Sequence, residues 1–200
     1  MKNLMMKKFP QIILLCLLAG FATASVAATA GLDSAAIGKA AGTDATTTPD
    51  GVVHLAWSRH DVAVKVDGAP LDPAAGLGSW AAFLPTDHGT MVMGDTVVFQ
   101  DEVDAAMDAA FAHGLGVTAL HNHFFYDQPR VFFMHIEGHG DAVTLATGVK
   151  AVWDAIKAVR AKNPVPVEGF GGSAPQAGKL DADAISKLVG HPAQVLGDRK

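Results

Sequence analysis

Histidines gather in one short stretch of the chain, HNHFFYDQPRVFFMHIEGHG, which covers residues 121–140. The stretch holds four histidines, one aspartate and one glutamate. Imidazole and carboxylate groups bind transition metals, and the same groups move protons in catalysis. The stretch therefore predicts either a metal site or a catalytic site, and the strands around it decide which side chains can meet.

GVTALHNH and PRVFFMHIE have the composition of two strands, and YDQP between them is typical of a turn. Side chains two residues apart share one face of a strand. A hairpin folded symmetrically about Gln128 places His121 directly opposite His135 and His123 opposite Phe133. Directly opposed side chains have Cβ atoms ~5 Å apart, which is close enough for the imidazoles to hold one ion.

His121, His123 and His135 form the predicted set of metal ligands, and Glu137, on the same face, is a fourth candidate. Zinc is the first choice for such a set, with copper, manganese and iron left open. A register change of one residue would turn His135 to the wrong face. The alternative is a hydrogen-bonded network without a metal. The opposite face, with Phe132, Met134 and Ile136 (all apolar), is predicted to be core.

Two further residues are catalytic candidates. His139 lies between two glycines, where the chain could present N–H groups to an anion or simply turn into the next helix. Glu102 opens the helix before the histidine strand, where it could act as a general base or only stabilise the helix N-terminus. Asp95, in MGDT, is expected to make a turn.

Apolar residues recur at helical spacing in residues 101–114 and 141–163, and Asp101 and Asp141 are the predicted N-caps. Four strands are predicted before the first helix, with Asp67-Gly68 as a turn after the second. The order β-β-β-β-α-β-β-α favours an α+β fold, an antiparallel sheet with two amphipathic helices packed on one face.

The chain has a basic start, a short apolar core and then small residues that offer cleavage points after Ala27 or after Ala30, and residues 1–27 are taken as the predicted segment. This pattern predicts a signal peptide and a periplasmic or secreted protein without a transmembrane segment. Cys16 follows Leu15, where lipoprotein signals carry a small residue, so we expect no lipid anchor.

The predicted organisation has three further parts: a tether with a short helix (28–50), an α+β domain (51–163), and a Pro/Gly-rich linker that leads into a truncated second repeat (164–200). The repeat is predicted because residues 32–42 and 180–190 share the pattern Leu-Asp-x-x-Ala-Ile-x-Lys-x-x-Gly.

Removal of the signal peptide would take away three lysines and the single cysteine, leaving 12 Lys+Arg against 20 Asp+Glu, a net charge of −8. This charge argues against nucleic acid as a partner. Without disulfides, stability must come from the core, a metal or a homo-oligomer.

The blocks GLGSWAAF, MGD, LHNH, PR and MH-x-x-GHGD together resemble the LppY/LpqO-type lipoprotein family, a domain of unknown function, over about residues 31–160. The resemblance implies export and a shared site around His121, His123, His135 and His139. It implies no particular reaction.

Three hypotheses follow: a metalloenzyme, a non-catalytic protein of the cell envelope that binds a metal or a small ligand, and a structural or interaction module without metal. An open coordination position beside a pocket would favour the first, and histidines that point apart would favour the third. Whether the protein is an enzyme stays undecided at this point, because the chain has no HExxH, GxSxG or P-loop motif.

Overall fold

The structure is a computed structural model that describes residues 31–167, 178 and 180–194. The predicted signal peptide lies outside the described residues. In chain order the elements are α1 (Ser34–Ala41), β1 (Ala45–Thr47), β2 (Val53–Ser58), β3 (Lys65–Val66), β4 (Ala69–Pro70), α2 (Pro73–Gly76), β5 (Gly78–Thr86), β6 (Gly89–Phe99), the 3₁₀ turn η1 (Gln100–Glu102), α3 (Val103–Ala112), β7 (Gly116–His121), β8 (Asp127–Gln128), β9 (Val131–Gly140), α4 (Ala142–Lys162) and α5 (Ala182–Val189).

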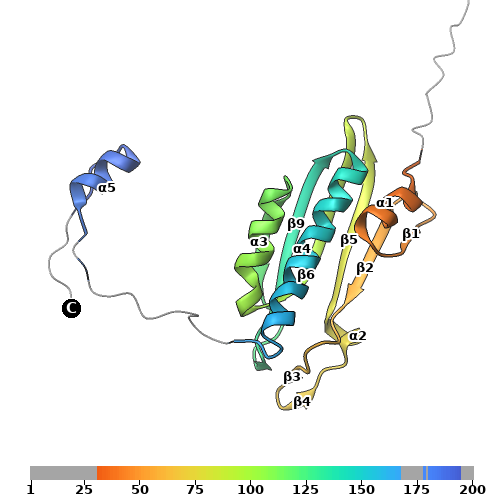
Figure 1. The fold of residues 1–200 in the computed structure, drawn as a ribbon, viewed down its shortest axis with the longest axis horizontal. Coiled ribbons are helices and arrows are strands. Elements are labelled where there is room, and N and C mark those ends of the chain that lie inside the picture. The colour runs from red at the N-terminus through yellow and green to blue at the C-terminus, as the bar shows by residue number, and fades with distance from the viewer. Residues whose placement is uncertain (1–30, 168–177, 179, 195–200) are drawn as a thin grey trace, which may run out of the picture. The chain divides into compact units, whose positions relative to one another are not determined.

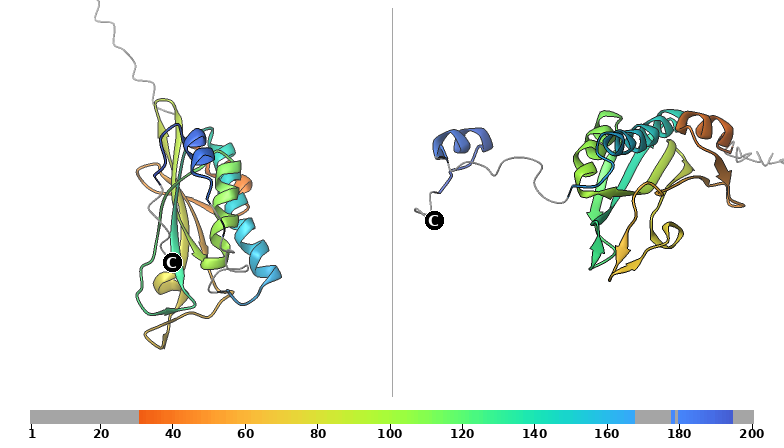
Figure 2. Two further views of the ribbon diagram at one scale, coloured as in Figure 1. Left: turned by 90° about the vertical axis from the view of Figure 1, so that its left-hand side faces the viewer. Right: turned by 60° about the horizontal axis from the view of Figure 1, so that its bottom comes forward.

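Six strands form one antiparallel sheet in the order β1-β2-β5-β6-β9-β7. Helices α1, α3 and α4 cover one face of this sheet (Figure 1), and the layer they form is seen edge-on in Figure 2. The predicted α+β class is therefore confirmed. The other face of the sheet carries the alternate residues of each strand, including the histidines of β7 and β9.

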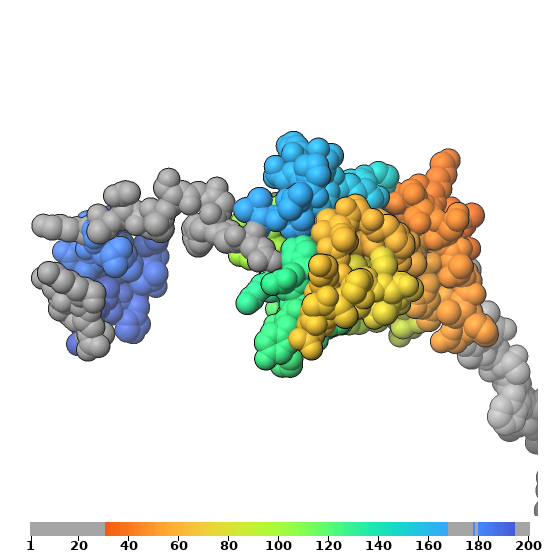
Figure 3. Space-filling model, turned by 90° about the horizontal axis from the view of Figure 1, so that it is seen from below, coloured from red at the N-terminus to blue at the C-terminus, as the bar shows by residue number. Residues whose placement is uncertain are grey.

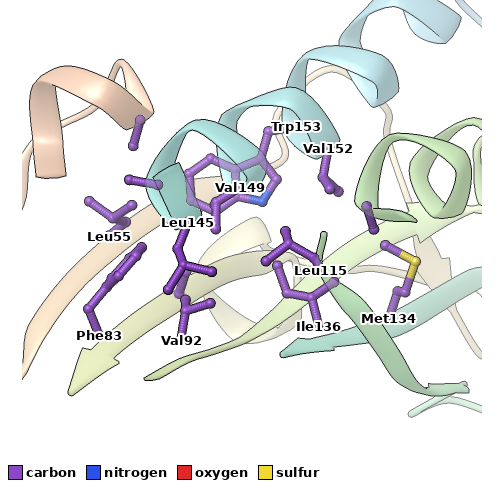
Figure 4. Packing of buried hydrophobic residues seen from close by; sticks show 14 of the residues in the cluster. Leu55, Phe83, Val92, Leu115, Met134, Ile136, Leu145, Val149, Val152 and Trp153 are labelled. Carbon is purple, nitrogen blue, oxygen red and sulfur yellow. The ribbon is translucent and has the colours of Figure 1, made fainter. Parts of the chain in front are cut away.

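Helix α4 lies along the middle of the sheet and buries the predicted apolar stripe completely. Its side chains meet those of β5, β6 and β9 in the main core (Figure 4). The residues of the stripe are Leu145, Val149, Val152, Trp153 and Ile156. The predicted cap is also present, because the Asp141 side chain accepts a hydrogen bond from the backbone N–H of Thr144 (2.8 Å).

Helix α3 follows its prediction less closely. Ala106 and Ala110 are buried, but Phe111, predicted to lie in the apolar stripe, is 58% exposed. Asp101 does not cap this helix, because η1 precedes α3 and the Asp101 carboxylate pairs with Arg160 instead. The helix ends at Ala112 with His113 as its C-cap, and Gly114 follows with a left-handed φ of 72°.

The segment predicted to be a tether belongs to the folded domain from α1 onward. Ile37 is 1% exposed in the main core, and β1 pairs with β2 at the edge of the sheet. The composition of residues 28–50 is rich in Ala, Thr and Gly, which resembles a linker. Ile37 and Ala41 are nevertheless buried in the main core, Leu32 and Ala40 pack against it, and α1 lies on α4.

The second predicted strand leaves the main sheet. Only Lys65–Val66 is extended, as β3, and it pairs with β4 through the predicted Asp67-Gly68 turn, whose φ angles of 51° and 78° are both positive. β3 also pairs with β8. We call residues 59–77 the arm, and Figure 3 shows it (yellow) beside the segment around β8 (green).

The arm covers one end of the sheet face that has no helices. Beneath it lies a second, smaller apolar cluster made of Val64, Leu77, Val97, Phe99, Val131 and Phe133. The rest of this face is open, as the exposed side chains of Trp80, Leu84 and Met93 show. We call this uncovered part the open face.

The two copies of the repeated segment have the same local structure. α1 and α5 each begin after an aspartate that caps the helix, Asp33 and Asp181, and each end at a left-handed glycine, Gly42 and Gly190. Residues 168–177 of the predicted linker lie outside the described residues. Among the described helices, none has the length and apolar character needed to cross a membrane.

Candidate functional site

The register of β7 and β9 differs by two residues from the symmetric hairpin. His121 lies opposite Phe133, and Ala119 lies opposite His135, with an irregularity between Val117 and Ala119. The predicted pairing was wrong because YDQP is not a simple turn. Its Asp127 and Gln128 form β8, which pairs with β3 of the arm, so the chain leaves β7 at His121.

A shift of two residues leaves Ala119 and His121 on their predicted face, whereas Val117, beyond the irregularity, lies opposite Ile136 and packs against the main core. His121 and His135 therefore still share the open face, now as diagonal neighbours across β7 and β9. Their Nε2 atoms lie 3.0 Å apart and the two rings meet edge to face, with centroids separated by 4.8 Å. The structure thus brings together the pair of imidazoles that the sequence predicted.

Asp95 joins this pair from the neighbouring strand β6, where it lies opposite His135. Its Oδ2 atom is 3.8 Å from His135 Nε2, and its side chain is only 14% exposed. The other carboxylate oxygen, Oδ1, is buried without a hydrogen-bond partner. Asp95 was expected to make a turn, and this expectation was wrong because MGDT continues β6 without a break.

The sequence held a weak signal for Asp95. Met91, Met93 and Asp95 alternate with buried residues, a spacing that puts them on one face of a strand. What the sequence did not show is that β9, which comes after β7 in the chain, inserts between β6 and β7. That strand order is what places the carboxylate beside His135.

His123 lies just beyond the end of β7, next to the histidine pair. Its ring stacks on the ring of Phe133 with centroids 3.5 Å apart and an angle of 11° between the planes. The centroid of the His121 ring lies 5.1 Å from that of His123 and 6.2 Å from that of Phe133. His123 is thus close to the pair, but its ring is stacked on the ring of Phe133, a member of the apolar cluster beneath the arm.

Glu137 and His139 are on the same face of β9 but farther from the pair. Glu137 lies opposite Met93 on one side and Gly116 on the other, and its side chain leans over Gly116. His139 lies opposite Met91, ~13 Å along the strand from His135 at ~3.3 Å per residue. The predicted loop at GHG is absent, because β9 continues through Gly140.

Glu102 does not face the histidines. Its carboxylate has no exposed surface and accepts hydrogen bonds from both terminal nitrogens of Arg59 (2.8 and 2.9 Å) and from the backbone N–H of Phe99 (2.8 Å). Arg160 Nε lies 2.6 Å from the same carboxylate. We call the group Arg59, Asp61, Asp101, Glu102 and Arg160 the buried ion network.

This network ties three parts of the fold together: the start of the arm, η1 and the last turns of α4. Arg59 also lies over the rings of Phe99 and Trp57, at 4.7 and 5.3 Å from their centroids. Isolated charges at such a position would be costly to bury, but here each charge has a partner of opposite sign. Glu102 is therefore a structural residue in this arrangement, and a role as general base would require the network to open.

The network also sets the protonation of its members. Burial alone would raise the pKa of Asp61, but the hydrogen bonds and positive charge of Arg59 outweigh burial and hold this pKa below its usual 3.8. Burial acts against the charged form of Arg59 too, and the carboxylates of Glu102 and Asp61 outweigh it, so the pKa of Arg59 is raised. Arg59 and Asp61 are thus held in their charged forms.

No group of three or more His, Cys, Asp or Glu side chains among the described residues is close enough to hold a metal ion as it stands. A pocket of about 100 Å³ lies in the hairpin connection and is lined by Asn122, Phe125, Asp127, Arg130, Val131 and Phe132. It is smaller than the 300 Å³ or more of an ordinary small-molecule site. None of the candidate histidines lines it.

The fold and the site define an α+β domain whose antiparallel sheet has one helix-covered face and one open face with a histidine pair. The chain belongs to the family described as Domain of Unknown Function (DUF1259), which matches residues 35–155. The matched region runs from α1 into α4 and includes every candidate site residue. Neither the curated proteins nor the solved structures contain a match to the chain.

Proposed function

We propose that this domain binds one divalent transition metal on its open face, with zinc as the first choice, through His121 and His135. One observation carries the proposal: the Nε2 atoms of the two rings lie 3.0 Å apart. Two nitrogen ligands at ~2.0–2.1 Å from a tetrahedral zinc ion are ~3.3 Å from each other. The observed separation is therefore close to that of two ligands of one ion.

Asp95 supplies the third ligand in this proposal. Its Oδ2 atom needs to approach His135 by only about half an ångström to reach the ~3.3 Å expected between two zinc ligands. Its Oδ1 atom is buried and unpaired, and a carboxylate in that state gains from a cation. His123 is the candidate for a fourth ligand, and to serve as one it must leave its stack on Phe133.

Three protein ligands leave one position on a tetrahedral ion for water or substrate, which is the arrangement of catalytic zinc sites. The proposal stops at metal binding, however. Glu102 is enclosed in the buried ion network, and His139 is ~13 Å along β9 from His135, so neither is placed to move a proton at the ion.

We also infer that the chain is an exported protein of the LppY/LpqO type. The support is the signal-peptide pattern of residues 1–27 and the sequence blocks GLGSWAAF, LHNH and MH-x-x-GHGD. Cell fractionation tests this inference: the processed protein is expected in the periplasm or the medium. Recovery of the unprocessed chain in the cytoplasm would contradict it.

The metal proposal is tested by the metal content of the full chain, expressed and purified without an affinity tag. We expect about one zinc per chain in the parent and none in His121→Ala/His135→Ala. His88→Ala is the matched control, because His88 lies in the exposed turn between β5 and β6 and should leave the metal content unchanged.

Two results would overturn the proposal. One is a parent protein that takes up no zinc, copper, manganese or iron after reconstitution. The other is a double variant that keeps the full metal content. In the first case the His121–His135 contact is a hydrogen bond within a structural or ligand-binding surface, which is the alternative that the sequence left open.

A further inference from the structure

Two methionines stand on the open face of β6, away from the histidine pair. Met91 and Met93 alternate with the buried Val92, and the side chain of Met93 is 46% exposed. Neither belongs to the apolar cluster beneath the arm. Their thioethers are thus available to a ligand on the surface of the sheet, where apolar burial does not explain them.

A histidine lies directly across from these methionines. His139 on β9 pairs with Met91 on β6, and Met93 is its diagonal neighbour. Directly opposed side chains have Cβ atoms ~5 Å apart and diagonal ones ~7–8 Å, within reach of long flexible side chains such as methionine. Two thioether sulfurs and one imidazole nitrogen can therefore meet above the β6–β9 pair.

The neighbouring residues leave this position to soft ligands. Glu137, which is opposite Met93, leans the other way over Gly116 of β7. On the far side of β6, Trp80 of β5 pairs directly with Asp95 and is only a diagonal neighbour of Met93, so it lies in the same row as His135 and outside the position between Met91 and His139.

We propose that Met91, Met93 and His139 form a binding site for monovalent copper, Cu(I). Thioether sulfur is a soft ligand that selects Cu(I) over the divalent ions that imidazoles and carboxylates hold. The site is distinct from the divalent site, because His139 lies ~13 Å along β9 from His135. The Cu(I) proposal therefore does not depend on the divalent site, and each site can be confirmed or excluded by itself.

The test uses silver(I), which has the charge and ligand preference of Cu(I) and no redox chemistry under these conditions. It is titrated into the full chain carrying His121→Ala/His135→Ala and Cys16→Ser, so that neither the histidine pair nor the single thiol, itself a strong soft ligand, contributes. We expect about one Ag⁺ per chain. Adding Met91→Leu/Met93→Leu should abolish this binding, while Met107→Leu, on α3, should leave it unchanged. Leucine replaces methionine with little change in volume, so the sheet is preserved.

NMR of ¹³C-methyl methionine gives a readout that a purely structural role would not move. The signals of Met91 and Met93, assigned from the single Leu variants, should shift with Ag⁺, while those of Met107 and Met134 should not. His139→Gln should weaken Ag⁺ binding at least about tenfold. Ag⁺ binding of unchanged affinity in the double Leu variant, or no shift at Met91 and Met93, would overturn the site.

Discussion

The Nε2 atoms of His121 and His135 lie 3.0 Å apart although the backbone pairs His121 with Phe133 and not with His135. The contact is diagonal across β7 and β9, and it exists because both side chains lean toward each other on the same face. Asp95 approaches from β6 on the other side of His135. The strands β6, β7 and β9 therefore contribute one side chain each to the site. Four predictions test this site and the contacts that hold the domain together.

Asp95→Asn should lower zinc affinity at least about tenfold, because the amide keeps the size of the carboxylate and removes its charge. Competition with a chromophoric chelator measures the change. Asp108→Asn, on the exposed side of α3, is the matched control and should bind zinc like the parent. Equal affinities in the parent and in Asp95→Asn would exclude Asp95 as a ligand.

Glu102→Gln should destabilise the domain by about 3–5 kcal/mol, because it leaves the guanidinium groups of Arg59 and Arg160 buried without their carboxylate. Urea unfolding measures the loss. Zinc content per folded molecule should not change, since Glu102 does not face the histidine pair. A variant of normal stability that has lost its metal would instead assign Glu102 to the site.

The contribution of Asp61 to stability should depend on pH. Its pKa in the folded protein is below the usual 3.8, so its stabilising effect is fully present above about pH 4 and is lost as the pH falls through the folded-state pKa. The difference in urea midpoint between the parent and Asp61→Asn should therefore be larger at pH 6 than at pH 3. A difference that grows toward pH 3 would contradict this account.

Ile37→Ala should destabilise the domain by about 2–5 kcal/mol, because the side chain is buried between α1, α4 and the sheet. Thermal or urea unfolding tests this value. Lys39→Ala, on the exposed side of the same helix, is the control and should have little effect. If Ile37→Ala unfolds like the parent, α1 belongs to a tether, as its composition first indicated.

Much of the fold was predictable from periodicity. The stripe of α4, its cap at Asp141 and the alternation along β9 all follow from local spacing, and the structure confirms them. The predictions failed where contacts with a segment distant in the sequence decide the local structure. Phe111 is exposed although it falls at helical spacing, and within residues 61–67 only Lys65–Val66 is a strand, because this segment pairs with β4 and β8 and not with the main sheet.

The candidate site was predictable in part for the same reason. Alternation along a strand assigns each side chain to a face, so it placed His121 and His135 together even though the expected register was two residues off. Alternation does not say which strands are neighbours. Asp95 was missed, and Glu102 was taken for a site residue, because both depend on contacts between segments that are far apart in the sequence.

The sequence by itself thus determined the long helix α4, the long strand β9 and the shared face of His121 and His135, because these depend on spacing along the chain. Only the tertiary structure decided that β9 lies between β6 and β7, that Asp95 stands beside His135, and that Met91 faces His139. Strand order and register are set by the packing of the whole core and by the pairing of β8 with β3. Those are long-range interactions, which no local pattern records.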